Sequence, residues 1–336
     1  MRREEGSASP GVLAVLILLA AALAGFAAIL PSARTYERRS RETQAGRERL
    51  EKAAYEILEA LAADPTPGSD SPFDPVWNRV NREADGVTVE LRDISSRLNP
   101  NYLRKKLLVE TSLKGLLAPG ATPESLQQYR EDKGLSASLN HYRDFFPASM
   151  EKYLTCYGWA NINTTDEFVL RSLHRYRKGS REEAEAFHAK IQALLSDRRI
   201  VAEAELPGFL GADAGILEPT FSAAPSWNVN FLDPYLLGEV LAYPPYGLEE
   251  PSKKSSLLLG ERGFGELSES RVAVILGVPE NHVLLHYLGT RTWFWEIRAR
   301  NDRGWFVLVA ARDPRADRAG GAGRPRFIVL ERRWSV

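Results

Sequence analysis

The pattern of apolar and polar residues predicts a long N-terminal helix in two parts. Residues 12–30 form a run without a charged or strongly polar side chain. As a helix this run is about 28 Å long, close to the roughly 30 Å apolar core of a bilayer. Residues 32–62 contain no proline, and their apolar positions recur with helical spacing at Leu50, Ala54, Ile57, Leu58 and Leu61. We therefore predict a membrane-spanning helix over 12–30 that continues as an amphipathic helix over 31–62.

The rest of the chain alternates between breaks, helical patterns and strand patterns. Residues 63–75 contain four prolines and end the long helix. Apolar and polar residues alternate over 86–93, which predicts a half-buried strand. Residues 95–265 are mostly helical in pattern, with helix starts such as Thr122-Pro123 and Asp233-Pro234. A short helix then leads into three aromatic and β-branched segments, and a tight hairpin over 301–304 joins the first two.

These elements predict an α+β fold. The early strand needs partners, and the three C-terminal strands supply them. The expected arrangement is a long helix packed on a small antiparallel sheet, with a large and mostly helical domain inserted between the first strand and the others. The Gly-, Arg- and Asp-rich loop within 311–325 has no function that its sequence indicates.

Composition narrows the possible functions. Lys plus Arg and Asp plus Glu both number 44, so the net charge of zero argues against a general binder of polyanions. Cys156 is the single cysteine and cannot form a disulfide within its own chain. The Arg-rich stretch 34–49 is interleaved with glutamates, which is more typical of a solvated helix face than of a nucleic-acid site.

No catalytic constellation is present, and the chain is not predicted to be an enzyme. The glycine spacings lack the residues that complete a P-loop or a dinucleotide turn, and there is no nucleophile motif. His282 and His286 are four residues apart, but the glutamate of a zinc-protease helix is missing. Packing or surface roles are therefore favoured for them over a metal site.

The motif Asn-x-Asn occurs three times before an apolar helical run. The pairs are Asn99 and Asn101, Asn161 and Asn163, and Asn228 and Asn230. In each copy a leucine follows nine residues after the first asparagine: Leu108, Leu170 and Leu237. Asparagine side chains mimic backbone turns and bond to nearby amides. We therefore predict that these residues cap the following helices, and we disfavour ligand binding by their amides.

Several of these segments resemble one known family. The stretch "YGWANINTTDEFVLRSL" (157–173) resembles the "iNvNTAppevLraL" signature of minor pseudopilin K of type II secretion systems (general secretion pathway protein K). "VELRDISSRLNPNYL" (89–103) is similar to the earlier strand and Asp-x4-Leu-Asn-x-Asn segment of that family, and "YLGTRTWFWEIRAR" (287–300) falls where the family has its C-terminal strands. Two departures stand out: "NINTTD" replaces the Thr-Ala-Pro-Pro of the family, and the leader contains Glu4 and Glu5.

The resemblance implies processing at the N-terminus. A prepilin peptidase would cut after Gly11 and methylate Val12. The fifth mature residue is then Leu16, where most pilins have glutamate and K pseudopilins typically do not. The expected segments are a leader (1–11), a transmembrane helix (12–30), its soluble continuation (31–62), a linker and first strand (63–94), an inserted helical domain (95–265), and a C-terminal helix and β-meander (266–336).

The resemblance also implies a role and partners. A K pseudopilin sits at the tip of the pseudopilus with minor pseudopilins I and J, helps to start assembly of the major pseudopilin, and contacts exoprotein or secretin. It is a single-pass inner-membrane protein with its bulk in the periplasm, whereas the arginines of 34–49 would place that bulk in the cytoplasm. Relatives bind calcium, but the resemblance assigns no Ca²⁺ ligands here. The alternative is a bitopic membrane protein whose cytoplasmic helical domain binds nucleic acid or a regulatory partner.

Overall fold

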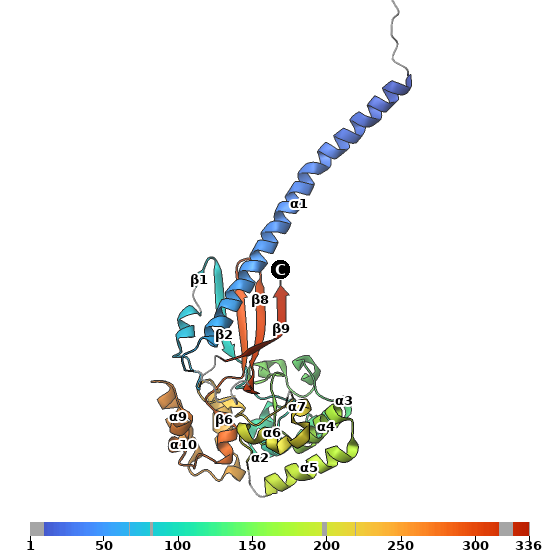
Figure 1. Ribbon diagram of the computed structural model, residues 1–336. Coiled ribbons are helices and arrows are strands. Elements are labelled where there is room, and N and C mark those ends of the chain that lie inside the picture. Colours follow the sequence, from blue (N-terminus) through green and yellow to red (C-terminus); the bar gives the residue numbers. More distant parts are fainter. Residues whose placement is uncertain are drawn as a thin grey trace, which may run out of the picture.

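The computed structural model describes residues 10–66, 68–80, 83–196, 200–218, 220–315 and 325–335, without the side chains of 10, 13 and 27–33. One continuous helix, α1 (Pro10–Ala62), begins the chain, and its N-terminal half projects away from the body (Figure 1). The predicted apolar face of its C-terminal part, from Leu50 to Leu61, is buried. The predicted amphipathic continuation is therefore confirmed as a helix.

The predicted membrane span is a separate matter. Among the residues that the structure describes, no helix has both the length and the apolar character needed to cross a membrane. Residues 13 and 27–30 of the predicted span lie outside the described side chains.

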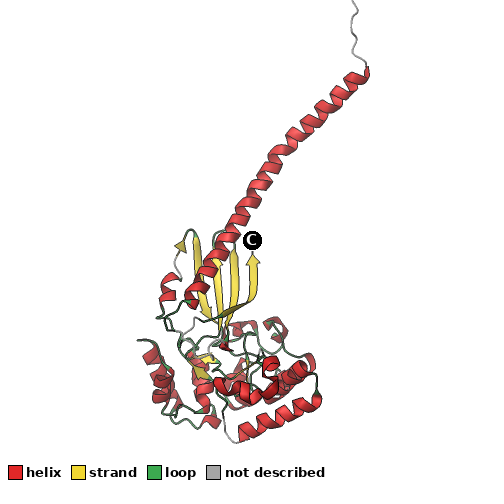
Figure 2. Cartoon of the chain, viewed as in Figure 1, coloured by secondary structure: helices red, strands yellow, loops and turns green. Residues whose placement is uncertain are grey.

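A five-stranded antiparallel sheet packs against α1 (Figure 2). Its strands in spatial order are β1 (Glu83–Ala84), β2 (Val87–Asp93), β7 (Phe294–Arg300), β8 (Trp305–Arg312) and β9 (Phe327–Ser335). The predicted early strand thus pairs with the C-terminal strands, and the hairpin over 301–304 joins β7 to β8 as expected. One sheet face, which includes Trp295, Ile297 and Leu308, forms a core cluster with the buried residues of α1.

The chain between β2 and β7 forms the inserted helical domain. Its helices are α2 (Lys105–Glu110), α3 (Pro123–Lys133), α4 (Glu167–Lys178), α5 (Arg181–Ser196), α6 (Leu206–Leu210), α7 (Ala214–Leu217), α8 (Pro234–Leu241), α9 (Pro251–Arg262) and α10 (Glu269–Leu276). Its strands are β3 (Ala160–Asn161), β4 (Phe221–Ser222), β5 (Trp227–Asn228) and β6 (Leu288–Gly289). Short 3-10 helices are η1 (Pro75–Arg79), before the sheet, and, within the inserted domain, η2 (Ser112–Leu116), η3 (Leu139–Tyr142), η4 (Ala148–Tyr153), η5 (Glu203–Glu205), η6 (Gly211–Asp213), η7 (Pro244–Tyr246) and η8 (Val283–His286).

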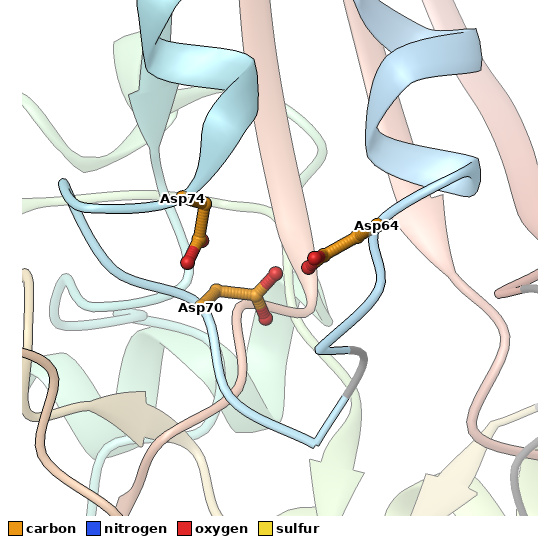
Figure 3. Close-up of side chains that lie close together, drawn as sticks. All are labelled: Asp64, Asp70 and Asp74. Atoms are coloured by element: carbon orange, nitrogen blue, oxygen red, sulfur yellow. The ribbon is translucent and has the colours of Figure 1, made fainter.

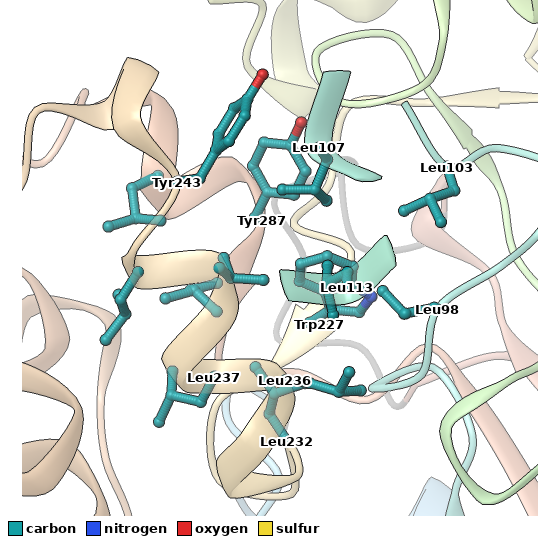
Figure 4. Packing of buried hydrophobic residues seen from close by; sticks show 14 of the residues in the cluster. Leu98, Leu103, Leu107, Leu113, Trp227, Leu232, Leu236, Leu237, Tyr243 and Tyr287 are labelled. Carbon is teal, nitrogen blue, oxygen red and sulfur yellow. The ribbon is translucent and has the colours of Figure 1, made fainter. Parts of the chain in front are cut away.

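The core of this domain extends further along the chain than the predicted boundary at residue 265. Val272 and Leu276 of α10 belong to the same buried cluster as Leu236 and Leu237 of α8. Figure 4 shows this cluster around Trp227, with side chains from several segments facing one another. Helix α10 therefore packs with the inserted domain and not with the C-terminal strands, because its apolar face is complementary to α9 and not to the sheet.

Candidate functional site

The three Asn-x-Asn motifs form the same turn. In each copy the Oδ1 atom of the first asparagine accepts the backbone N–H of the second, at 3.0 Å for Asn99, 2.8 Å for Asn161 and 2.9 Å for Asn228. The carbonyl of the first asparagine then accepts two further backbone N–H groups; in the second copy these come from Thr164 and Thr165. The motif is therefore a turn built by the first asparagine side chain.

The asparagines do not cap the helices, which corrects the prediction. The N-cap residues are Asp166 for α4 and Asp233 for α8, and their carboxylates accept from the N–H groups of Phe168 and Tyr235. Helix α2, which follows the first copy, has Arg104 as its N-cap residue, and the Arg104 side chain makes no capping hydrogen bond. The turn displaces the helix start by several residues, so an aspartate reaches the free amides and the asparagine does not. The leucines nine residues after each first asparagine are buried as expected.

The second asparagine of each motif binds a distant peptide group. Its amide donates to a backbone carbonyl and its Oδ1 accepts the N–H of the same residue. The three pairs are Asn101 with Ser136, Asn163 with Val201 and Asn230 with Leu267, separated by 35, 38 and 37 residues. We call these three pairs the peptide clamps. Each clamp closes a loop of similar length in its own part of the domain.

An arginine binds each turn at the same position. Arg130 donates to the carbonyl of Leu103 at 2.8 Å, Arg104 to that of Thr165 at 3.3 Å, and Arg262 to that of Leu232 at 2.6 Å. These carbonyls each lie four residues after the first asparagine. The guanidinium groups thus pair with carbonyls of residues that precede the N-caps and so accept no hydrogen bond within the helix.

Each motif also follows a short extended segment that pairs in parallel with a later one. Leu98 pairs with Leu154, β3 with β4, and β5 with β6. Turn, clamp, arginine contact and parallel pair therefore recur together. We call the three segments repeat unit 1 (98–154), repeat unit 2 (160–222) and repeat unit 3 (227–289). The domain is a tandem array of one supersecondary unit.

Repeat unit 3 joins the domain to the linker that follows α1. The carbonyl of Asp70 accepts from the amides of Asn228 at 2.8 Å and Asn230 at 3.2 Å. The backbone N–H of Asp70 donates to Thr290, and its carboxylate accepts from the N–H of Thr292 at 2.7 Å. The third motif therefore holds the linker against the start of the C-terminal strands.

Asp70 also belongs to an acidic cluster with Asp64 and Asp74. The three side chains extend from the linker toward one another (Figure 3), with one oxygen of each within 4.8 Å of the others. Burial raises the pKa of Asp70 to about 7 and that of Asp74 to about 6. Arg312, itself buried, lies 3.4 Å from Asp70 and lowers the pKa of this carboxyl in part.

The donor set of this cluster fits a hard cation such as Ca²⁺, which prefers carboxylate and carbonyl oxygens. Two features compete with a bound cation. Arg312 already supplies a positive charge to Asp70, and both oxygens of Asp74 accept from Ser71. Among the described residues, these three aspartates are the candidate metal ligands whose oxygen atoms lie close together. Asp64 and one oxygen of Asp70 would have to supply most of the coordination.

The remaining predicted residues are not brought into a common site. Gly11 and Val12 lie in the first turns of α1, where Val12 is exposed, and leader residues 1–9 lie outside the described residues. The Nδ1 atom of His282 accepts from the N–H of Leu284. His286 lies 3.4 Å from the amide of Asn163, and burial lowers its pKa to about 4. The two histidines therefore have packing and turn roles.

The sequence pattern did not point to the clamp partners or the arginines. Ser136, Val201 and Leu267 share no side-chain chemistry, because the clamps bind their backbone atoms. The arginine contacts are also made to carbonyl groups. The clamp partners share one regularity, which is their similar distance along the chain from the second asparagine. This regularity can be recognised only after the partners have been identified in the structure.

The described part of the chain therefore defines a class: a long N-terminal helix on an antiparallel sheet, with a repeat domain inserted in the sheet. No family model matches the chain, and no curated protein matches it significantly. A chain of the solved GspK-GspI-GspJ complex of the type 2 secretion system from enterotoxigenic Escherichia coli is similar to it, with 16% identity and a TM-score of 0.43. The match covers 89% of this chain and 99% of that chain.

The likeness between the two structures is loose, and the function proposed below rests on the residues and architecture of this chain.

Proposed function

We propose that this chain is a minor pseudopilin of a type II secretion system, of the K type, and has a structural role without catalysis. The observation that supports this most directly is the layout of the chain. Helix α1 is packed on the sheet at one end and free at the other, and the inserted domain lies at the end of the sheet away from the free half of α1 (Figure 1).

The free half of α1 supports a role in anchoring and assembly. Its described apolar side chains, among them Leu18 and Phe26 at 70%, are largely exposed. Such a surface needs a cover, which a bilayer provides before assembly and neighbouring pseudopilin helices provide afterwards. We propose that residues 12–30 span the inner membrane and that the body lies in the periplasm.

The position of the inserted domain supports a cap at the pseudopilus tip. A subunit in the shaft needs room for another subunit above it, whereas bulk on the side away from the anchor blocks such an addition. Leu16, in place of the pilin glutamate, fits a subunit with no neighbour above it. We propose that the chain joins minor pseudopilins I and J, helps to begin polymerisation of the major pseudopilin, and contributes to protein export across the outer membrane.

The decisive experiment is N-terminal processing. The full chain is co-expressed with a prepilin peptidase, and the mature N-terminus is determined by mass spectrometry. The proposal expects a methylated Val12, and it expects the Gly11→Leu variant to remain uncut. An intact Met1 in the wild-type chain, or a cut within the apolar run, would refute the proposal.

Orientation and partners are tested separately. A phosphatase that is active only in the periplasm is fused to the C-terminus, and activity is expected. An inactive fusion with an intact N-terminus would favour the bitopic protein with a cytoplasmic domain that binds nucleic acid or a regulator. The chain is also co-expressed with minor pseudopilins I and J and purified from detergent extracts of the membranes. Co-purification of the three proteins is expected and tests the tip complex directly.

A further inference from the structure

A cavity with a mixed polar and apolar lining lies where the repeat units meet the start of β7. It has a volume of about 70 Å³, which is room for a few water molecules. Its walls include Arg97, Asn99 and Arg104 from the region of the first motif, and Trp159 from the segment before the second. This cavity belongs neither to the acidic cluster nor to the peptide clamps.

The lining of the cavity is rich in hydrogen-bond donors and has no carboxylate. Two arginines and several serine and threonine hydroxyls contribute to its wall, and neither aspartate nor glutamate does. Asn99 and Trp159 each carry a buried N–H group, Nδ2 and Nε1 respectively, that has no partner in the described part of the chain. A buried donor without an acceptor is costly, so these two groups call for an acceptor inside the cavity.

Comparison of the three motifs makes the free amide of Asn99 informative. The equivalent amide of Asn161 donates to the carbonyl of Ala224, and that of Asn228 donates to the carbonyl of Asp70. Asn99 and Asn161 both line the cavity, and among the described residues only Asn99 leaves this group unpaired. Its neighbour Gly158 leaves the space open: an added Cβ would lie 2.7 Å from Nδ2 of Asn99.

The charges around the cavity are positive and only partly balanced. The guanidinium of Arg97 makes no hydrogen bond or ion pair within the described ranges, although Asp93 and Glu296 act on it at longer range. Asp93 is already bonded by Ser95 and Ser96. Burial lowers the pKa of Arg97, as expected for a cation that has lost water without gaining a close partner. Arg104 donates two bonds to repeat unit 2 and brings a second positive charge.

We propose that this cavity binds a small oxyanion, such as a phosphate, sulfate or carboxylate group, between Arg97, Arg104, Asn99 and Trp159. Planar guanidinium groups pair well with oxyanions, and such charge-assisted bonds are the strong ones. Residues 157–159 and Arg97, which line the cavity, are half-buried. A bound anion would join repeat unit 1 to repeat unit 2 at the sheet. This site is independent of the proposed pseudopilin role.

The test is calorimetric titration of the full chain in detergent with sodium phosphate, sodium sulfate and sodium citrate, in chloride buffer at constant ionic strength. We expect saturable binding of at least one anion at one site. Arg97→Gln and Trp159→Phe should each weaken it, the former by at least tenfold. Two matched controls should leave the affinity unchanged: the exposed Arg79→Gln, and Trp77→Phe, which removes another unpartnered buried indole N–H that does not line the cavity.

Two results would overturn the proposal. One is the absence of saturable binding for all three anions, which would mean that water alone satisfies the donors. The other is binding whose affinity is the same in the wild type, Arg97→Gln and Trp159→Phe, which would place the anion elsewhere. If one variant fails to fold, the other still decides between these results, because Trp159→Phe removes the N–H donor and keeps an aromatic ring, and Trp77→Phe reports the effect of the same loss of volume away from the cavity.

Discussion

The peptide clamp of repeat unit 2 offers a direct test of what the asparagine motifs do. Asn163 is 3% exposed, and it binds the carbonyl of Val201 at 2.9 Å and the N–H of Val201 at 3.0 Å. Asn163→Ala removes both hydrogen bonds and keeps the backbone N–H that the Asn161 side chain accepts. The perturbation therefore removes the clamp and leaves the turn.

The cost follows from the groups that lose their partners. Val201 is 2% exposed, and no other hydrogen bond to its peptide groups is present in the described ranges. Leaving one buried polar group unpaired costs about 1–3 kcal/mol, so two groups cost about 2–6 kcal/mol. A domain is stable by only about 5–15 kcal/mol, so this loss is large. By the former interpretation, in which the asparagine caps a helix, the loss would be about 1 kcal/mol.

The assay is urea unfolding of the full chain in detergent, followed by tryptophan fluorescence, with hydrogen exchange at the Val201 amide as a local readout. Asn163→Ala should lower the free energy of unfolding by about 2–6 kcal/mol and remove exchange protection at Val201. The matched control is Asn140→Ala, an exposed asparagine in the same domain, which should change stability by less than about 0.5 kcal/mol. Equal stability of the two variants, with Val201 still protected, would refute the clamp.

Three other variants have defined outcomes. The pKa of Asp70 is raised from 3.8 to about 7, so its protonation favours the fold, and its contribution is complete below about 3.8 and lost as pH rises through about 7; Asp70→Asn should flatten the rise in urea sensitivity between about pH 4 and pH 7. The pKa of His286 is lowered from 6.5 to about 4, so its contribution is complete above 6.5 and lost as pH falls toward 4; His286→Gln should reduce acid sensitivity in that window, and an unchanged acid midpoint would contradict this. Gly289→Ala places a Cβ 2.6 Å from Cβ of Pro225 and should destabilise by about 1–3 kcal/mol in thermal melts, whereas Gly238→Ala in α8 meets open space and should not.

Much of the fold could be predicted from periodicity. The amphipathic part of α1, strand β2, the hairpin over 301–304 and the start of α3 at Thr122 all agree with the structure. Such features depend on neighbouring residues, where spacing and capping chemistry act directly. The boundary near residue 265 could not be predicted, because the apolar positions of α10 do not indicate which element covers them, and only packing shows that α9 does.

The functional features divide in the same way. The Asn-x-Asn motifs were found in the sequence because their side chains act locally, on a backbone N–H two residues away. Their assignment as caps was wrong, because an aspartate several residues later takes that place in two of the three copies. The acidic cluster was not found, since Asp64, Asp70 and Asp74 look like ordinary linker residues until the linker folds back on itself.

The sequence by itself determined the long helix, the strands and the positions of the three turns, because each depends on side chains within one or two helical turns. Only the tertiary structure decided that the turns belong to three repeat units, that each second asparagine clamps a peptide group 35 to 38 residues away, and that the third unit holds Asp70. The physical reason is that these contacts are made to backbone atoms. Every residue type carries the same N–H and C=O groups, so a partner that binds them leaves no mark on the sequence.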